Sequence, residues 1–369
     1  MLRDVKDKKL KKHPQRAKID KKMERKSSKI EEKASLGEIT EPEQEAMLQL
    51  SGSLSLLQST YGQRGNFELV VPTTSGGLAH FTRNNDRDDL PWTGPLRFGA
   101  STGIFRGASL IQSDFGEKGN LEVVAVNLDG RSLSHLWRDS GAFPEWHEPI
   151  HISKESREPI FSGGPAMIRS SAGHRGNFEV VVPKINGGFA HYWRDNDDPE
   201  LSWHGPFEFA VNDGIFDAVA LIQSNLGAAG NLEMVARSGD RLIFYWRESG
   251  DQSSWSGPEI IAEGVAGSPS IVQSTFGKRG NFEVVVPLAA GGFAHLWRDN
   301  DDQELRWHGP FTFGMNVGHV ESVSLIQSNF GMPGHLEIAA LAEGQLLSFW
   351  RDSGPDFRWN GPFVVSNPV

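Results

Sequence analysis

Histidine, tryptophan, arginine and aspartate recur together in this chain, at spacings that suit the binding of a sugar. Two sets share the same spacing: His191, Trp193, Arg194, Asp195 and Trp203, and His295, Trp297, Arg298, Asp299 and Trp307. A sugar presents an apolar face of C–H groups that stacks on an indole ring, and its hydroxyls need planar partners with several donors or acceptors. Both sets therefore predict carbohydrate-binding sites.

Related residues elsewhere in the chain widen this candidate set. The carbohydrate-binding residues predicted on this chemistry are His80, Trp92, His135, Trp137, Arg138, His191, Trp193, Arg194, Asp195, Trp203, Trp246, Arg247, His295, Trp297, Arg298, Asp299, Trp307, Trp350 and Arg351. Several equivalent sites on one rigid scaffold would raise avidity toward a branched or surface-displayed glycan, because the first contact raises the effective concentration for the next.

Six copies of one sequence unit position these residues. The motif Gly-Asn-Phe/Leu-Glu, with His335 replacing Asn in the last copy, recurs every 50 to 57 residues at Gly65, Gly119, Gly176, Gly230, Gly280 and Gly334. Each unit holds four short apolar runs bounded by Gly, Pro, Asn and Asp, which is typical of strands. Four strands per unit is the pattern of a propeller blade, so residues 52–369 predict an all-β, six-bladed β-propeller.

Long and short units alternate along the chain. The long units contain Pro72, Pro183 and Pro287, each of which is expected to end a second strand because proline cannot donate to a sheet ladder. A Gly-Gly pair follows each of these prolines, and the other three units lack both features. The predicted ring therefore has three-fold as well as six-fold character, and a repeated site would occur three or six times.

Tryptophan occupies two columns of the repeat. These are Trp137, Trp193, Trp246, Trp297 and Trp350 in the third strand, and Trp92, Trp146, Trp203, Trp255, Trp307 and Trp359 before the fourth. A purely structural role is the alternative to ligand stacking, because large flat rings can fill the wedge between neighbouring blades.

Glutamate and arginine also recur once per unit. The columns are Glu68, Glu122, Glu179, Glu233, Glu283 and Glu337, and Arg83, Arg138, Arg194, Arg247, Arg298 and Arg351. We expect a carboxylate–guanidinium pair that braces adjacent strands. Equivalent copies argue against catalysis, which needs one differentiated site.

A charged tail precedes the repeats. Residues 1–45 hold 14 Lys and Arg against 10 Asp and Glu, which leaves 23 basic and 37 acidic residues beyond them out of 37 and 47 in all. The tail is predicted to be disordered or transiently helical, with a short helix over residues 41–50, and residues 46–369 to form the propeller domain. A protein partner of the tail is one expectation, whereas the acidic body argues against a nucleic-acid groove.

Several kinds of chemistry lack their sequence signatures. The chain has no cysteine, and no calcium loop, zinc spacing, phosphate loop or nucleophile elbow is present. The sequence therefore predicts no cofactor, metal or catalytic residue. It also shows no membrane-length apolar segment and no secretory signal peptide, so a soluble protein, cytoplasmic or exported by an unconventional route, is expected.

The repeat resembles the blade consensus of bacterial and fungal propellers related to the Photorhabdus lectins. The resemblance rests on GNLEVVAV, LSHLWRD and W-x-x-P in one unit and on GNFEVVVP, FAHLWRD and WHGPF in another, and it covers residues 52–369. It implies a lectin that binds fucose or O-methylated sugars in pockets between blades. The best-known members have seven blades, whereas six units occur here.

Three function classes follow from these observations. The first is a multivalent lectin for fucosylated or O-methylated glycans. The second is a protein-interaction scaffold that uses the ring faces and the tail, and the third is an enzyme with one site, for which the divergent Thr82 and Asn84 of the first unit are the hint. Selective binding on a glycan array separates the first class from the other two.

Overall fold

The computed structural model describes residues 49–153, 156–248, 254–352 and 358–366. The predicted charged tail over residues 1–45 and most of the predicted helix over residues 41–50 lie outside the described residues. Leu50, at the end of that predicted helix, forms an isolated antiparallel bridge with Thr73. None of the described helices is long and apolar enough to cross a membrane.

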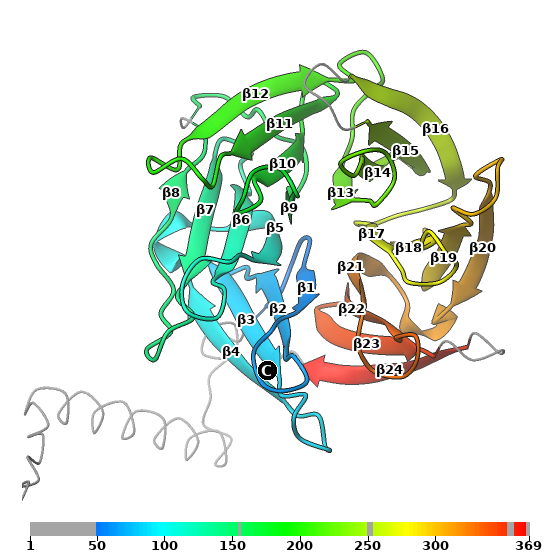
Figure 1. Ribbon diagram of the computed structural model, residues 1–369, viewed down its shortest axis with the longest axis horizontal. Coiled ribbons are helices and arrows are strands. Elements are labelled where there is room, and N and C mark those ends of the chain that lie inside the picture. Colours follow the sequence, from blue (N-terminus) through cyan, green and yellow to red (C-terminus); the bar gives the residue numbers. More distant parts are fainter. Residues whose placement is uncertain (1–48, 154–155, 249–253, 353–357, 367–369) are drawn as a thin grey trace, which may run out of the picture. The chain divides into compact units, whose positions relative to one another are not determined.

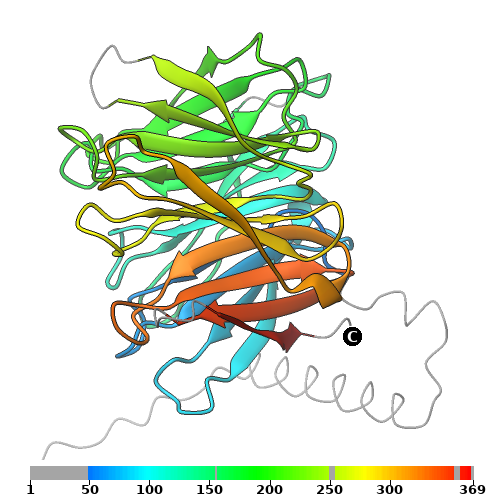
Figure 2. The same cartoon turned by 90° about the vertical axis from the view of Figure 1, so that its right-hand side faces the viewer.

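The described residues form a six-bladed β-propeller, as the repeat predicts. Six four-stranded antiparallel sheets surround a central axis, and each sheet holds four strands consecutive in the sequence (Figures 1 and 2). Blades 1 to 3 are β1 (Ser55–Gln58), β2 (Phe67–Pro72), β3 (Leu78–Arg83) and β4 (Trp92–Phe98); β5 (Phe105–Gln112), β6 (Leu121–Asn127), β7 (Leu133–Arg138) and β8 (Ile150–His151); and β9 (Ala166–Arg169), β10 (Phe178–Pro183), β11 (Phe189–Arg194) and β12 (Trp203–Phe209).

Blades 4 to 6 repeat this order. They are β13 (Ala218–Gln223), β14 (Leu232–Ser238), β15 (Arg241–Arg247) and β16 (Trp255–Glu263); β17 (Ser270–Gln273), β18 (Phe282–Pro287), β19 (Phe293–Arg298) and β20 (Trp307–Phe313); and β21 (Val320–Gln327), β22 (Leu336–Ala342), β23 (Gln345–Arg351) and β24 (Trp359–Ser366). Two short 3-10 helices, η1 (Ala100–Thr102) and η2 (Met315–Val317), follow the fourth strands of blades 1 and 5.

The hydrophobic core is divided among the blade boundaries. Six buried clusters occur, and each joins side chains of two neighbouring blades. The tryptophans of the second column begin the fourth strand in five blades and precede it in blade 2. One of them packs against the buried cluster at each boundary, which confirms the predicted wedge-filling role. Each blade therefore buries its apolar surface only by contacting its neighbours.

The ring closes without a shared blade. Since the first and last strands belong to different sheets, blade 6 meets blade 1 only through the contacts of an ordinary boundary. The side chain of Gln58 bonds both the backbone N–H and the side chain of Asn329, at 3.0 and 2.7 Å. Leu56 and Leu341 share one buried cluster across this boundary.

Side-chain amides link neighbouring blades near the axis. At five boundaries, the glutamine that ends the first strand of one blade accepts a hydrogen bond from a backbone N–H of the preceding blade. Written as donor to acceptor, these bonds are Thr60 to Gln112, Ser171 to Gln223, Asn225 to Gln273, Thr275 to Gln327 and Asn329 to Gln58. At the remaining boundary, Arg169 replaces glutamine and pairs with Asp114 at 3.5 Å. These bonds fix the order and spacing of the blades.

Glycine is required in the turn between the first two strands. Gly65 has a φ of 73°, and a Cβ at this position would overlap the backbone carbonyl oxygen of Ser59. Gly344 has a similar φ of 75°, but a Cβ there would have no heavy atom within 4 Å.

These two glycines allow steric overlap to be separated from backbone strain. Gly344→Ala should lower the free energy of unfolding by about 1–2 kcal/mol, the cost of a left-handed backbone for an L-residue. Gly65→Ala should cost more, because the turn must also move away from a fixed carbonyl. Denaturant unfolding of both variants measures the difference, and equal losses would show that the overlap relaxes freely.

Candidate functional site

A carboxylate lies on the second strand of every blade, and it is buried in all of them except blade 3, where Glu179 is partly exposed. In blade 5, the Glu283 side chain accepts a bond from Ser274 at 3.3 Å and contacts His295 Nε2 at 2.7 Å. The same Glu–His contact joins Glu68 to His80, Glu122 to His135 and Glu179 to His191 at 2.7 to 2.8 Å. Burial lowers the pKa of His135 and so favours its neutral form, despite the adjacent Glu122.

An arginine of the following blade faces this carboxylate. The Arg351 guanidinium lies 3.1 Å from His295 Nδ1 and 4.0 Å from a Glu283 oxygen. Because guanidinium only donates, His295 Nδ1 accepts, and its Nε2–H is left to donate to Glu283. Charged partners across blades also link Arg194 to Glu122 and Arg298 to Glu233.

The expected brace within a blade is therefore wrong. Glu68 lies opposite Thr82 in the ladder, whereas Arg83 lies opposite Phe67. Neighbouring residues of a strand point to opposite faces, so Glu and Arg of one blade face different neighbours. Arg83 pairs instead with Glu337 of blade 6, at 3.0 Å.

The boundary between blades 5 and 6 contains a cavity of about 840 Å³. Glu283, His295 and Arg351 supply its buried polar groups, and Trp297, Phe311, Phe313 and Trp359 are among its aromatic lining. Phe311 is 56% exposed, which places an aromatic ring at the solvent-facing side of the cavity. The volume lies within the range of small-molecule sites, of about 300–1,000 Å³.

Indole N–H groups add unused donors at several boundaries. The Nε1 atoms of Trp146, Trp203, Trp307 and Trp359 are buried and make no hydrogen bond to any residue that the structure describes. Three of these rings, Trp146, Trp203 and Trp359, meet the histidine of the preceding blade edge to face, at 5.6 to 5.8 Å between ring centroids. Each of these three boundaries thus combines an indole N–H, an imidazole and a carboxylate.

The long blades hold their arginines in place. The Nε atoms of Arg83, Arg194 and Arg298 donate to Asn85, Asn196 and Asn300, respectively, at 2.7 to 2.9 Å. These guanidinium groups also lie over the rings of Phe67, Phe178 and Phe282, at 3.7 to 4.2 Å from the ring centroids. The alternation of long and short units is thus expressed in the way each arginine is oriented.

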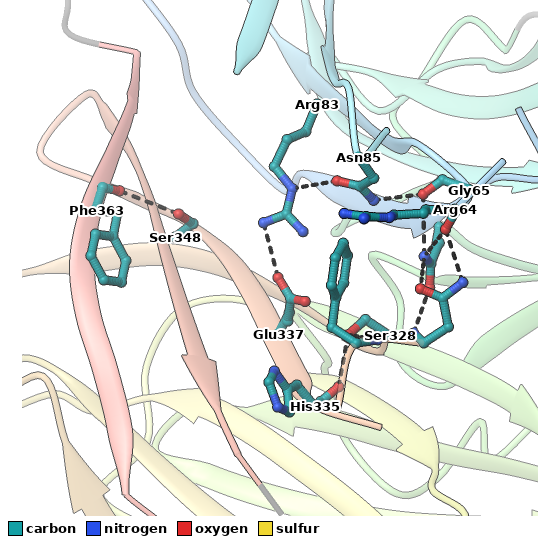
Figure 3. A network of polar contacts seen from close by, with 12 residues as sticks. Arg64, Gly65, Arg83, Asn85, Ser328, His335, Glu337, Ser348 and Phe363 are labelled. Atoms are coloured by element: carbon teal, nitrogen blue, oxygen red, sulfur yellow. Dashed lines mark hydrogen bonds and ion pairs between the residues drawn. The ribbon is translucent and has the colours of Figure 1, made fainter. Parts of the chain in front are cut away.

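The boundary between blades 6 and 1 is closed by an ion pair. Ser348 takes the place of histidine there, and Glu337 bonds Arg83 directly (Figure 3). Asn85 fixes the other side of the guanidinium and donates to the Gly65 carbonyl at 2.5 Å, as Figure 3 also shows. The two charges of this boundary therefore satisfy each other.

The boundary between blades 4 and 5 departs in a different way. Phe244 replaces histidine, so Oε2 of Glu233 is buried without a hydrogen-bond partner among the described residues. Burial raises the pKa of Glu233 to about 7, although Arg298 and a bond from Ser224 oppose the change. At the boundary between blades 1 and 2, by contrast, Thr82 stands where the other blades have tryptophan. Its hydroxyl donates to Glu68 at 2.8 Å.

The predicted residues do not all face the blade boundaries. Asp195 and Asp299 each accept a bond from the backbone N–H two residues on, within turns. The third-strand tryptophans Trp137, Trp193 and Trp297 do share a face with the boundary glutamates, because they lie opposite them in the ladder. Their rings stack on His147, His204 and His308 of their own blades, at 4.2 to 4.7 Å. Trp350 stacks on His335 and Trp246 on Phe244.

Of the other predicted residues, one set meets at the boundaries. His80, His135 and His191 contact the carboxylates, Trp92, Trp203 and Trp307 pack between blades, and Arg351 reaches His295. Arg138 and Arg247 end the third strands of blades 2 and 4.

Sequence reasoning left several boundary residues out of the candidate set. They are the six glutamates, Trp146, Trp255 and Trp359, and the exposed apolar residues that follow a proline of the fourth strand, namely Leu96, Ile150, Phe207, Phe311 and Phe363. The recurrence of Glu once per unit was the available signal. That four of these glutamates lie beside a histidine of the neighbouring strand becomes clear only once the strand register is known.

The acidic side chains and the inner strands bear on two further kinds of site. No group of three or more His, Asp or Glu side chains within the described ranges is placed to hold a metal ion. The inner strands of blades 1 to 4 line a space of about 520 Å³, whose lining includes Leu57, Ile111, Ile168, Gln223 and Arg169. Arg169 is the charged residue among the described residues of that lining, and it pairs with Asp114.

The fold and its boundaries define a six-bladed β-propeller with a repeated polar site between blades. No sequence-family model matches this chain, and neither does any curated protein. Solved structures do match. The BP39L lectin from Burkholderia pseudomallei is similar with a TM-score of 0.59 and 21% identity, over 87% of this chain and 86% of that one.

Two eukaryotic structures extend the comparison. The fungal lectin from Aleuria aurantia, described as a six-bladed β-propeller with a novel fucose recognition mode, is similar with a TM-score of 0.59 and 15% identity, over 87% and 99% of the two chains. An α-L-arabinanase from Penicillium chrysogenum gives 0.54 and 12%, over 80% and 92%. At such identities the likeness establishes the fold, which lectins and a hydrolase share.

The unpartnered carboxylate of blade 4 predicts a pH-dependent stability. The pKa of Glu233 rises from 4.5 to about 7 on folding, so between these values the folded chain holds a proton that the unfolded chain has released. Stability from this residue is therefore present below about pH 4.5 and lost as the pH rises toward 7. Across that range Glu233→Gln should gain on the order of 3 kcal/mol relative to the wild type.

Denaturant unfolding at several pH values measures this gain. Phe244→His is the matched variant, because it gives Glu233 the partner found in four other blades and should move the pH dependence to lower pH. If the free energies of unfolding of the wild type and Glu233→Gln change with pH in parallel, Glu233 is not the group that causes the pH dependence.

Proposed function

We propose that this protein is a multivalent carbohydrate-binding protein whose sites lie between blades. The observation that carries the proposal is the cavity between blades 5 and 6. Its buried Glu283, His295 and Arg351 offer acceptors and donors at fixed positions, and its walls are aromatic. This combination matches a ligand that has hydroxyls on one side and C–H groups on the other.

The polar groups of this cavity are oriented before any ligand arrives. Ser274 and His295 hold Glu283, and Arg351 donates to His295. A ligand hydroxyl therefore meets groups that need little reorganisation, which lowers the entropic cost of binding. Trp359 presents an indole N–H with no partner among the described residues, which is a further donor for a sugar oxygen.

Fucosylated or O-methylated glycans are the proposed ligand class. Such sugars carry a methyl group beside their hydroxyls, and Phe276, Phe311 and Phe313 offer apolar surface beside the polar floor of the cavity. A mutant of the Aleuria aurantia lectin, which is similar in fold, is described in complex with α-methyl-L-fucoside. Recurrence of the Glu–His pair in blades 1, 2, 3 and 5 supports several sites on one ring.

A glycan array and titration calorimetry on the full chain test this proposal. We expect selective binding of fucosylated or O-methylated glycans, and a loss of affinity of about tenfold or more at the blade 5–6 site in Arg351→Ala, the scale of one charge-assisted hydrogen bond. Arg87→Ala is the control, because Arg87 is exposed and pairs with Asp89 in a turn of blade 1.

A second variant guards against loss of folding. His295→Phe copies the residue that blade 4 already has at this position, so the ring is expected to tolerate it. It should weaken binding and lower the free energy of unfolding by on the order of 3 kcal/mol, the cost expected for the unpartnered Glu233, without abolishing folding. A blank array, or titrations in which both variants match the wild type, would reject the proposed site.

A further inference from the structure

The boundary between blades 4 and 5 has different residues at two of the positions that line the cavity between blades 5 and 6. Glu233 and Arg298 correspond to Glu283 and Arg351, but Phe244 stands where His295 stands and Glu259 where Phe311 stands. A polar residue has become aromatic and an aromatic residue has become acidic. The two boundaries therefore share a framework and differ in charge.

The strand register places these groups on one face of blade 4. Val235, Phe244 and Glu259 lie opposite one another on three neighbouring strands, and Glu233 is two residues from Val235. Residues two apart in a strand share a face, so Glu233, Phe244 and Glu259 point the same way. That face is turned toward blade 5, because Phe244 packs with Phe282 and lies 5.1 Å from the Arg298 guanidinium.

Two carboxylates of this boundary, Glu233 and Glu259, share the guanidinium of Arg298. Glu233 is 2% exposed, and its Oε2 has no partner among residues 49–153, 156–248, 254–352 and 358–366. Arg298 donates through Nε to Asn300 and is electrostatically coupled to both Glu233 and Glu259. Burial raises the pKa of both carboxyl groups, as expected where buried negative charge is not fully balanced.

Aromatic rings pack beside these charged groups. Phe244 meets Trp307 edge to face, with 5.4 Å between ring centroids, and stacks on Trp246 at 5.8 Å. The Nε1–H of Trp307 is buried, with no partner in the described chain. Ammonium groups are attracted both to carboxylates and to aromatic faces, whereas neutral hydroxyls gain less from either.

We propose that the site between blades 4 and 5 binds a sugar that carries a free ammonium group, such as a hexosamine. The sugar part of this assignment rests on the proposed function, and the positive charge rests on the exchange of Phe244 and Glu259. Glu259, at the exposed edge of the sheet, meets the ammonium first, and Glu233 supplies the buried countercharge. The chain then has two ligand classes on one ring, neutral sugars between blades 5 and 6 and an ammonium sugar between blades 4 and 5.

Calorimetric titration of the full chain at neutral pH tests the proposal. The probes are methyl β-D-glucosaminide and methyl β-D-glucoside, which differ at one substituent, together with methyl α-L-fucoside for the blade 5–6 cavity. Glu259→Gln removes the exposed charge, and Glu259→Phe installs the residue of blade 5. Glu263→Gln is the matched control, because Glu263 lies on the same strand with its side chain 66% exposed.

The wild type is expected to prefer the glucosaminide to the glucoside. Both Glu259 variants should reduce that preference by about tenfold or more, the scale of one charge-assisted hydrogen bond, while Glu263→Gln retains it. Glucosaminide binding that survives in Arg351→Ala places it outside the blade 5–6 cavity. No preference in the wild type, or a preference that both Glu259 variants retain, overturns the inference.

The two proposals fail in different ways. Fucoside binding without glucosaminide binding refutes the ammonium site and leaves the proposed function standing. Glucosaminide binding that depends on Glu259, without fucoside binding, supports the ammonium site and refutes the proposed binding of fucosylated glycans between blades 5 and 6. If Glu233 is neutralised by a proton alone, the glucosaminide and the glucoside will bind equally, which also refutes the ammonium site.

Discussion

Closure of the ring is the constraint on which the rest of the structure depends. A four-stranded blade cannot bury its two faces by itself, and here every hydrophobic cluster is shared by two neighbouring blades. The chain therefore gains its core only when all six boundaries form, including the one between blades 6 and 1. Tryptophan suits these boundaries because one flat ring fills a wedge that widens away from the axis.

The same boundaries must satisfy a buried or largely buried carboxylate in each blade. In four blades a histidine of the next strand does so, and in blade 6 the guanidinium of Arg83 does so. Only a partnered carboxylate is tolerated at low cost, so each substitution of the histidine changes the electrostatics of its whole boundary. The polar framework that suits ligand binding is thus also part of what holds the blades in register.

Divergence between copies then gives the ring chemically different sites. At the boundary of blades 5 and 6 the carboxylate, imidazole and guanidinium line an open cavity, whereas Arg83 and Glu337 close on each other between blades 6 and 1. Between blades 4 and 5, Phe244 leaves Glu233 without a donor. A repeat protein can vary one boundary in this way because the other five keep the ring closed.

The sequence by itself determined the repeat, the strands and the six blades. Gly65 and its counterparts, Pro72 and the two tryptophan columns are local signals, since turn geometry, strand ends and large apolar rings are properties of short segments. Partners across the ring were decided by the tertiary structure alone. Glu68 and Arg83 belong to one blade, yet the pleat turns them to opposite faces, and Arg83 meets Glu337, 254 residues away. Asp195 and Asp299 adjoin the arginines in the sequence, but they lie just beyond the ends of β11 and β19, where they accept bonds from backbone N–H groups of the following turns.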